Sequence, residues 1–325
     1  MKILKPALAG LGLIAAIALP MHGASAADWP VKPITMVVPF PAGGATDIVG
    51  RLLAKQLGER LGQSVIVENK GGANATIGMQ YVANSAPDGY TILYNTSSLT
   101  LSPALYKKLS FNPAKSFDAV STTATVPLVL LVSNDVPANT IEEFVQHAKS
   151  NPGTLNFASS GNGNITHLAG FLFNQGVGIS AAHIPYKGTA PALVDLVGGR
   201  TDYMMGTLSD ALPMIAAKKV KMLAVTTLDR VQNFPDLPTV DETVLKGFNL
   251  SAWQGVVTPA GVPEEVLAKL NAAVLASMKS EEMVRQLGEQ GTVILGSTRD
   301  EYAQFIDSQL LYWSKAVEDA GVERE

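Results

Sequence analysis

The sequence contains no cysteine among its 325 residues. This absence excludes disulfide bonds, metal sites built on thiolates and a cysteine nucleophile. It also excludes a lipid-modified cysteine behind a leader segment, so the mature chain is expected to carry no lipid anchor. A chain of this length buries enough surface to fold without disulfides.

Histidine is scarce as well, with four in the chain, and His147, His167 and His183 lie far apart without an H-E-x-x-H pattern. No metal is therefore expected. The nucleotide motifs G-x-G-x-x-G and G-x-x-x-x-G-K-[ST] are missing, so no cofactor is expected either. The formal charge is −4 and becomes −6 if Lys2 and Lys5 leave with a leader, which argues against nucleic acid as a partner.

The long apolar run of the chain lies at its N-terminus. Lys2 and Lys5 are followed by apolar residues up to Leu19 and then by Ala24-Ser25-Ala26, the pattern of a secretory signal peptide. We predict a signal peptide over residues 1–26. A membrane anchor is disfavoured because the run is shorter than the roughly 20 residues of a spanning helix. The mature protein is expected in the periplasm.

A glycine loop separates the first strand and helix of the mature chain. An apolar run ends at Val38, Gly43 and Gly44 turn the chain, and apolar residues then recur at helical spacing up to Leu61. Backbone N–H groups and the positive end of the helix dipole meet at such a helix start. We predict that this loop binds a carboxylate or phosphate. An ordinary strand-to-helix turn is the structural alternative.

Strand and helix patterns alternate along the rest of the chain, which predicts an α/β fold with parallel sheets. Further strands that end at Tyr94, Ala158 and Met205 are followed by polar loops. Ligands of open α/β sheets lie beyond the carboxyl ends of strands. We therefore expect these loops and the first glycine loop to line a central cleft between two lobes.

These loops are rich in Ser, Thr, Asn and Gly, with Phe40, Tyr186 and Trp253 nearby. An apolar pocket with a small number of positioned hydrogen-bond donors is suited to a small anionic ligand with an apolar body. Tyr186 and Trp253 as core aromatics, and His167 as a structural histidine, remain alternatives. No residue is assigned a catalytic role.

Several segments in order resemble one known family, the Bug-type extracytoplasmic receptors of tripartite tricarboxylate transporters, which are periplasmic solute-binding proteins. The segments are Trp29-Pro30-Val31-Lys32-Pro33-Ile34, Val38-Pro39-Phe40-Pro41-Ala42-Gly43-Gly44, Val67-Glu68-Asn69, Ala86-Pro87-Asp88-Gly89-Tyr90, Asn112-Pro113, Ala158-Ser159-Ser160-Gly161-Asn162-Gly163, Ile184-Pro185-Tyr186-Lys187-Gly188, Leu223-Ala224-Val225-Thr226 and Pro235 to Val240. The resemblance covers the chain from Trp29 to nearly its C-terminus.

The resemblance implies a two-lobed periplasmic-binding-protein fold, type II-like, with two crossovers. Lobe 1 is expected over residues 27–127 and 253–325, and lobe 2 over residues 128–252. It further implies a monomer that binds a small carboxylate and delivers it to membrane transporter subunits. The loops predicted from strand ends and from the resemblance contain the candidate ligand-binding residues Phe40, Ala42, Gly43, Gly44, Thr46, Asp47, Thr96, Ser97, Ser98, Ser159, Asn162, Gly163, Asn164, His167, Tyr186, Gly188, Thr207 and Trp253.

One departure from the family pattern bears on the ligand. Many relatives carry an acidic residue where this chain has Gly206-Thr207, so an ammonium group on the ligand would lack its partner. We therefore expect an aromatic dicarboxylate such as terephthalate first, and an aliphatic di- or tricarboxylate second. The alternatives are a secreted α/β hydrolytic enzyme with Ser159 or Ser160 as nucleophile, and a ligand-presenting partner of a membrane sensor.

Overall fold

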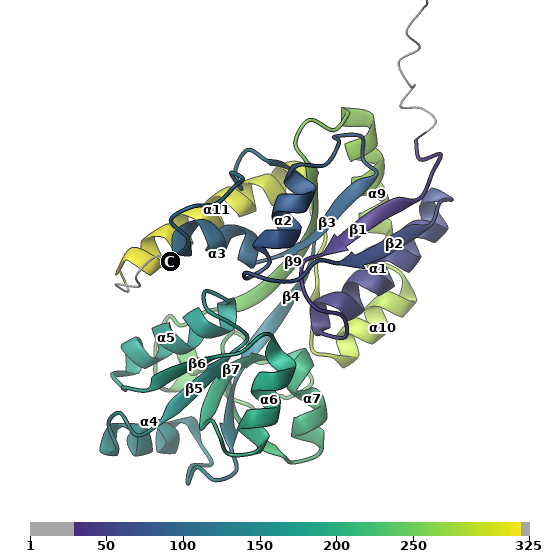
Figure 1. Cartoon of the computed structure of the whole chain (residues 1–325). Coiled ribbons are helices and arrows are strands. Elements are labelled where there is room, and N and C mark those ends of the chain that lie inside the picture. Colours follow the sequence, from purple (N-terminus) through teal and green to yellow (C-terminus); the bar gives the residue numbers. More distant parts are fainter. Residues whose placement is uncertain (1–28, 320–325) are drawn as a thin grey trace, which may run out of the picture.

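The computed structural model of the chain describes residues 29–319 (Figure 1). The predicted signal peptide lies outside the described residues. Within them, strands and helices alternate and gather into two lobes that share one path of hydrogen-bonded strands. The α/β class predicted from the sequence is confirmed.

Lobe 1 lies at the top of Figure 1. Its elements are β1 (Ile34–Val38), α1 (Ala45–Leu61), β2 (Val65–Asn69), α2 (Thr76–Ala83), β3 (Thr91–Thr96), α3 (Ser98–Leu105), the first part of β4 (Phe117–Ser133), β9 (Ser251–Pro259), α9 (Glu264–Met278), α10 (Glu281–Glu289), β10 (Val293–Ile294) and α11 (Arg299–Asp319). β1 pairs in parallel with β2 and β3, and β9 runs antiparallel between β3 and β4. The carboxyl ends of the three parallel strands therefore meet at one edge of this sheet.

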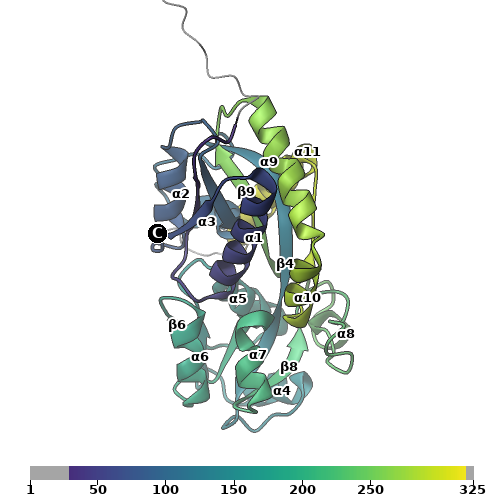
Figure 2. The same cartoon turned by 90° about the vertical axis from the view of Figure 1, so that its right-hand side faces the viewer.

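Lobe 2 repeats this plan. Its elements are the second part of β4, α4 (Ile141–Ser150), β5 (Asn156–Ser159), α5 (Ile165–Val177), β6 (Ala182–Pro185), α6 (Thr189–Val197), β7 (Tyr203–Thr207), α7 (Leu208–Ala216), β8 (Val220–Val225) and α8 (Val240–Thr243). β5 pairs in parallel with β6 and β7, while β7 and β8 run antiparallel to β4. Figure 2 shows α1 of lobe 1 directed toward this lobe.

The long strand β4 is the first of two crossings between the lobes. Residues 117–127 pair with β9, and residues 128–133 pair with β7 and β8. The chain returns at Leu250, immediately before β9. The Thr226 hydroxyl donates to the Leu250 carbonyl at 2.5 Å and lies 3.1 Å from the Leu128 carbonyl. The two crossing segments are thus tied together by one buried threonine, and the chain has the two crossovers that the resemblance implies.

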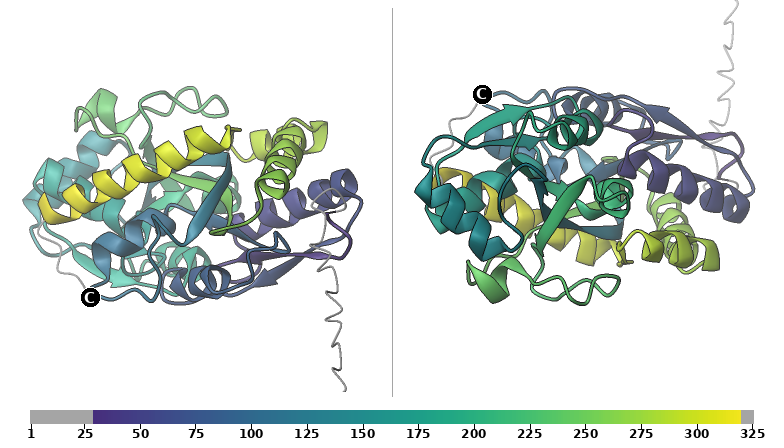
Figure 3. Two further views of the ribbon diagram at one scale, coloured as in Figure 1. Left: turned by 90° about the horizontal axis from the view of Figure 1, so that it is seen from above. Right: turned by 90° about the horizontal axis from the view of Figure 1, so that it is seen from below.

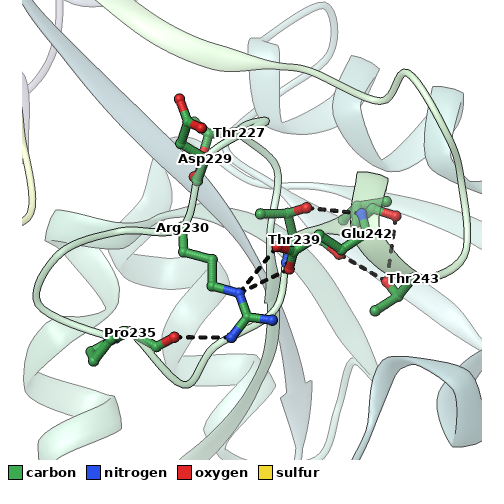
Figure 4. Close-up of polar contacts among 8 residues, drawn as sticks. Thr227, Asp229, Arg230, Pro235, Thr239, Glu242 and Thr243 are labelled. Atoms are coloured by element: carbon green, nitrogen blue, oxygen red, sulfur yellow. Dashed lines mark hydrogen bonds and ion pairs between the residues drawn. The ribbon is translucent and has the colours of Figure 1, made fainter.

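The loop that leads from β8 toward the return crossing is held by its own polar contacts (Figure 4). Thr239 and Glu242 form a capping box at the start of α8, since each side chain accepts from the other's backbone amide. Arg230 donates to Glu242 at 2.9 Å and to the Pro235 carbonyl at 3.0 Å. These contacts fix the course of a segment that has little regular structure.

Helix α11 packs against α3 and β4. Tyr302 and Ile306 join the cluster around Trp253 in lobe 1, whereas Trp313 belongs to the cluster around Phe173 in lobe 2. Seen from above, α11 runs alongside α3 (Figure 3, left, yellow), with which it makes close contact. Helix α11 thus covers α3 on the side away from α1.

Candidate ligand-binding site

The first glycine loop has the strand, turn and helix start that the sequence predicts. Gly43 has a left-handed φ of 89°, which explains the glycine there. Gly44 is the N-cap of α1, with φ −83° and ψ 169°, and gives no side-chain hydrogen bond to the helix. A Cβ at either glycine would meet no atom within 4 Å. The start of α1 therefore lacks a side-chain cap, and the space beside the two glycines is open.

Asp47 holds this loop from within. Its buried carboxylate accepts from the Gly43 amide and Arg51 Nε at 2.9 Å each and from Asn69 Nδ2 at 2.8 Å. Burial alone would raise the pKa of Asp47, but the hydrogen bonds from Arg51, Gly43 and Asn69 outweigh it and lower the pKa. Asn69 also donates to the Phe40 carbonyl at 3.0 Å. Asp47 was predicted to contact the ligand. The contacts that the structure shows for its carboxylate are within the protein, and they stabilise the conformation of the loop.

A carboxylate from lobe 2 lies at the start of α1. The Ala45 amide donates to Asp210 Oδ1 at 3.1 Å, and the Thr207 hydroxyl donates to Asp210 Oδ2 at 2.7 Å. The sequence argument treated Gly206-Thr207 as the loss of an acidic group. An acidic side chain nevertheless lies beside Thr207, because Asp210 is in the first turn of α7. Asp210 was missed, although its position just after the carboxyl end of β7 could have indicated it.

Asn74 makes a second contact between the lobes. Its Nδ2 donates to the Gly163 carbonyl at 2.8 Å, and its Oδ1 accepts from Ser98 Oγ at 3.1 Å and Asn164 Nδ2 at 3.4 Å. Asn74 has φ 48° and stands between Ala73 and Ala75, which also have positive φ. Such strain is common in functional loops. Sequence analysis missed Asn74, which follows the carboxyl end of β2 in a loop without apolar periodicity.

Many hydrogen-bonding groups in the glycine loop of lobe 2 are paired with side chains of the same loop. Asn164 caps α5 by accepting from the Thr166 amide at 3.1 Å. Ser160 Oγ donates to Asn164 Oδ1 at 3.1 Å, and the Ser160 amide donates to Thr166 Oγ1 at 2.9 Å. The polar groups of Ser160, Asn164 and Thr166 thus serve the loop itself, and the exposed Asn162 lies at its tip.

A pair of stacked histidines lies under this loop. The rings of His167 and His183 are parallel within 9° at a centroid distance of 3.8 Å. His167 Nδ1 accepts from the Gly163 amide at 3.2 Å, and His183 Nε2 lies 2.6 Å from Ser159 Oγ. Burial lowers the pKa of His167 to about 4, and burial together with the neighbouring His167 lowers that of His183 to about 3. Both imidazoles are therefore neutral near pH 7.

Ser159 next to His183 resembles part of a nucleophile site, but the side chain of Ser159 is 0% exposed. Its hydroxyl is also 3.2 Å from both the amide and the carbonyl of Gly161. Among residues 29–319, no three His, Asp or Glu side chains gather as a metal site. A buried hydroxyl that serves its own loop is a poor nucleophile for a substrate between the lobes.

The serine and threonine segment after β3 lies nearer the core than sequence analysis placed it. Thr96 ends β3, Ser98 starts α3, and Thr96, Ser97 and Ser98 are all buried. The Ser97 amide donates to the Trp253 carbonyl at 3.0 Å. Thr46 Oγ1 accepts from Gln254 Nε2 at 3.4 Å. These contacts join the first loop, the end of β3 and β9 into one surface.

The predicted aromatic residues differ in their surroundings. Trp253 is 3% exposed and packs on Phe305 of α11 at 5.2 Å between ring centroids. The Tyr186 hydroxyl donates to Asp195 at 2.8 Å, and burial together with this bond raises the pKa of Tyr186 to about 12. Phe40 is half-buried. Both Trp253 and Tyr186 thus have the contacts of structural aromatics, the alternative left open above.

The remaining predicted residues are backbone positions. The Gly188 amide donates to the Ser160 carbonyl at 3.1 Å, and Gly188 has φ 119°. Ala42 is exposed in the first loop. The structure brings the loops after β1, β2, β5 and β7 together between the lobes, and direct contact with a ligand stays a prediction for each residue.

The family model described as tripartite tricarboxylate transporter family receptor matches residues 49–322. The chain belongs to this receptor family. Its relatives of known structure include the periplasmic binding protein BugD, which is 37% identical to this receptor with a TM-score of 0.86, the match covering 91% of this chain and 100% of BugD. The receptor expectation and the periplasmic-binding-protein fold are thus confirmed.

Two further structures hold ligands. Rpa4515 of R. palustris, with adipate, is 32% identical with a TM-score of 0.88, covering 92% of this receptor and 100% of Rpa4515. MatC of Rhodopseudomonas palustris, with bound malate, is 33% identical with a TM-score of 0.83, covering 89% of this receptor and 100% of MatC. Membership of a solute-binding family also decides against the secreted enzyme. Among residues 29–319, every helix is too short or too polar to cross a bilayer.

Proposed function

We propose that this receptor binds a small dicarboxylate in the periplasm and delivers it to the membrane subunits of a tripartite tricarboxylate transporter. The observation that carries the proposal is the start of α1, where the glycine cap leaves backbone N–H groups to an outside acceptor and a carboxylate oxygen of Asp210 already accepts from Ala45. A site that holds one carboxylate in this way suits another. Export to the periplasm rests on the predicted signal peptide.

The related structures with adipate and malate support a diacid, because both ligands carry two carboxylates. They favour aliphatic diacids as the first compounds to test. Terephthalate, the aromatic diacid expected from the sequence, stays a prediction. Trp253 packs on α11 and the Tyr186 hydroxyl donates to Asp195, while Phe40 and Tyr186 are both half-buried.

The affinity expected of such a site is moderate. Hydrogen bonds to a charged group contribute about 1.5 to 3 kcal/mol each. Two or three such bonds with an apolar slot reach about −8 kcal/mol, which corresponds to a dissociation constant on the order of 1 μM.

Titration calorimetry of the mature receptor against adipate, malate, citrate, terephthalate and hexanoate tests the proposal. We expect micromolar binding of at least one diacid and much weaker binding of hexanoate, which has one carboxylate. Absence of heat with every carboxylate would contradict the proposal. Binding of citrate alone would move the ligand class from diacids to triacids.

A further inference from the structure

The start of α7 departs from the usual way in which a helix is capped. Thr207 is the N-cap and Asp210 lies in the first turn, a spacing at which the N-cap hydroxyl normally accepts from a backbone amide of that turn. Thr207 gives no such bond to α7. Its hydroxyl instead donates to Asp210 Oδ2 at 2.7 Å, which leaves Oδ1 to the Ala45 amide of lobe 1 at 3.1 Å. The geometry positions the carboxylate across the lobes.

The receiving end is matched to this carboxylate. The start of α1 has Gly44 as a cap without a side chain, and the buried Asp47 is used by Gly43, Arg51 and Asn69. Asp210, 165 positions away in the chain, therefore supplies the acceptor that the Ala45 amide does not receive from Asp47, the acid in the first turn of α1.

We propose that Asp210 is an internal anion that takes the ligand's carboxylate site in the ligand-free receptor, so that a ligand has to displace it. This inference rests on the proposed function. The Ala45 amide has one proton and makes one good hydrogen bond, and two carboxylates at one amide repel each other. A ligand carboxylate gains the amide only when Asp210 leaves it.

This exchange makes Asp210 an affinity-determining residue. The cost of displacing Asp210 from Ala45 is the same for a monoacid and a diacid, so it lowers both affinities by the same factor. A monoacid then exchanges one carboxylate for another and gains little, whereas a diacid keeps the contacts of its second carboxylate. Asp210 retains its bond to Thr207 when it leaves Ala45, which keeps the cost of displacement small.

The same contact ties the lobes together before a ligand arrives. Ala45 to Asp210 and Asn74 to Gly163 both join lobe 1 to lobe 2. Loss of the Asp210 carboxylate removes the first of these ties, so the ligand-free receptor is expected to open further in its absence.

Calorimetry with adipate and hexanoate tests the competition. Asp210→Asn keeps the size of the side chain and an oxygen acceptor but removes the charge. We expect it to tighten adipate binding and hexanoate binding by the same factor, about tenfold, which leaves the preference for the diacid unchanged. The matched control is Glu142→Gln, since Glu142 is an exposed acid in the first turn of α4, far from lobe 1 (Figure 1), and should change neither affinity.

Spin-label distances test, without any ligand, whether the bond from Ala45 to Asp210 holds the two lobes together. The chain has no cysteine, so Ile77→Cys on α2 and Val194→Cys on α6, both exposed, would carry the only two labels. We expect a longer distance between the labels when Asp210→Ala is added and no change with Glu142→Gln.

Weaker or unchanged binding of adipate by Asp210→Asn would show that Asp210 does not compete with the ligand. An unchanged label distance in Asp210→Ala would show that Asp210 does not hold the lobes together. If neither the wild-type receptor nor its variants bind any carboxylate, the proposed function fails. The label distance then decides alone whether Asp210 holds the lobes together.

Discussion

The glycine loops of the two lobes have the same layout, but the helices that follow them are capped differently. Each follows a strand and opens a helix, but Asn164 caps α5 by accepting from the Thr166 amide at 3.1 Å, whereas Gly44 gives α1 no side-chain bond. A capped helix start has a backbone donor already satisfied, and an uncapped one has it to offer. This difference supports the proposal that the start of α1 in lobe 1 binds the ligand's carboxylate, with the loop of lobe 2 as a supporting surface.

The two loops also differ in the charge state of what holds them. The first loop is held by an ionised carboxylate, Asp47, whose hydrogen bonds lower its pKa. The second is held by the neutral rings of His167 and His183, whose pKa values burial lowers to about 4 and about 3. Because an ordinary histidine has a pKa of about 6.5, the unfolded chain takes up protons at these two histidines in mild acid. Mild acid is therefore expected to destabilise the loop of lobe 2 before that of lobe 1.

The largest expected effect comes from making the first loop like the second. Gly44→Asp adds a carboxylate at the N-cap, where the backbone is extended and a Cβ meets no atom within 4 Å. The new side chain would cap α1 and repel the ligand. We expect diacid affinity to fall about a hundredfold, or about 2.7 kcal/mol, while the melting temperature holds or rises. Calorimetry and thermal unfolding measure the two effects.

Gly44→Ala is the control for this change, because it adds a Cβ without an acceptor. Its affinity should stay within about threefold of the wild type, a difference below 1 kcal/mol. Wild-type affinity in Gly44→Asp would show that the ligand carboxylate is held elsewhere.

Acid is expected to destabilise lobe 2 through its histidines. The pKa values of His167 and His183 are about 4 and about 3 in the folded chain, against an ordinary value of about 6.5 in the unfolded chain. The unfolded chain thus takes up protons first as the pH falls. Stability is complete above pH 6.5 or so and is lost below it, at no more than about 1.4 kcal/mol per pH unit for each histidine, reduced by solvent screening.

Urea unfolding between pH 7 and pH 5 measures this slope. His167→Phe with His183→Phe keeps two stacked rings without titratable nitrogens and should flatten it. His147→Gln on α4 is the control and should leave the slope unchanged. Equal slopes in the double variant and the wild type would remove the histidine pair as the cause.

The first loop was predictable from the sequence because its signals are local. Val38 ends an apolar run, Gly43 takes a positive φ, and the helix that follows keeps its apolar period. Asp210 and Asn74 were not predictable in the same way, since their partners Ala45 and Gly163 lie 165 and 89 residues away. Only the tertiary structure brings these polar pairs together.

The strand β4 shows a second limit. The continuous apolar run in this part of the sequence starts at Val126, whereas the strand begins at Phe117. Ser121 and Thr123 are polar but fully buried, and the Ser121 hydroxyl lies within hydrogen-bond reach of the Ser297 carbonyl at 3.0 Å. Polar residues satisfied by a distant segment look like loop in the sequence, because periodicity records burial only through apolar side chains.

The smallest expected effect comes from removing the side-chain cap of α5 in lobe 2. Asn164→Ala removes the acceptor of the Thr166 amide and of Ser160 Oγ. We expect the free energy of unfolding to fall by about 1 kcal/mol, with diacid affinity changed less than in Gly44→Asp. Asn164→Asp keeps the acceptor but replaces the donor to Asn74 with a charged oxygen, so urea unfolding should place it between Asn164→Ala and the wild type. A loss of affinity in Asn164→Ala as large as that in Gly44→Asp would mean that the start of α5 also holds the ligand, and the division of tasks between the two loops would fail.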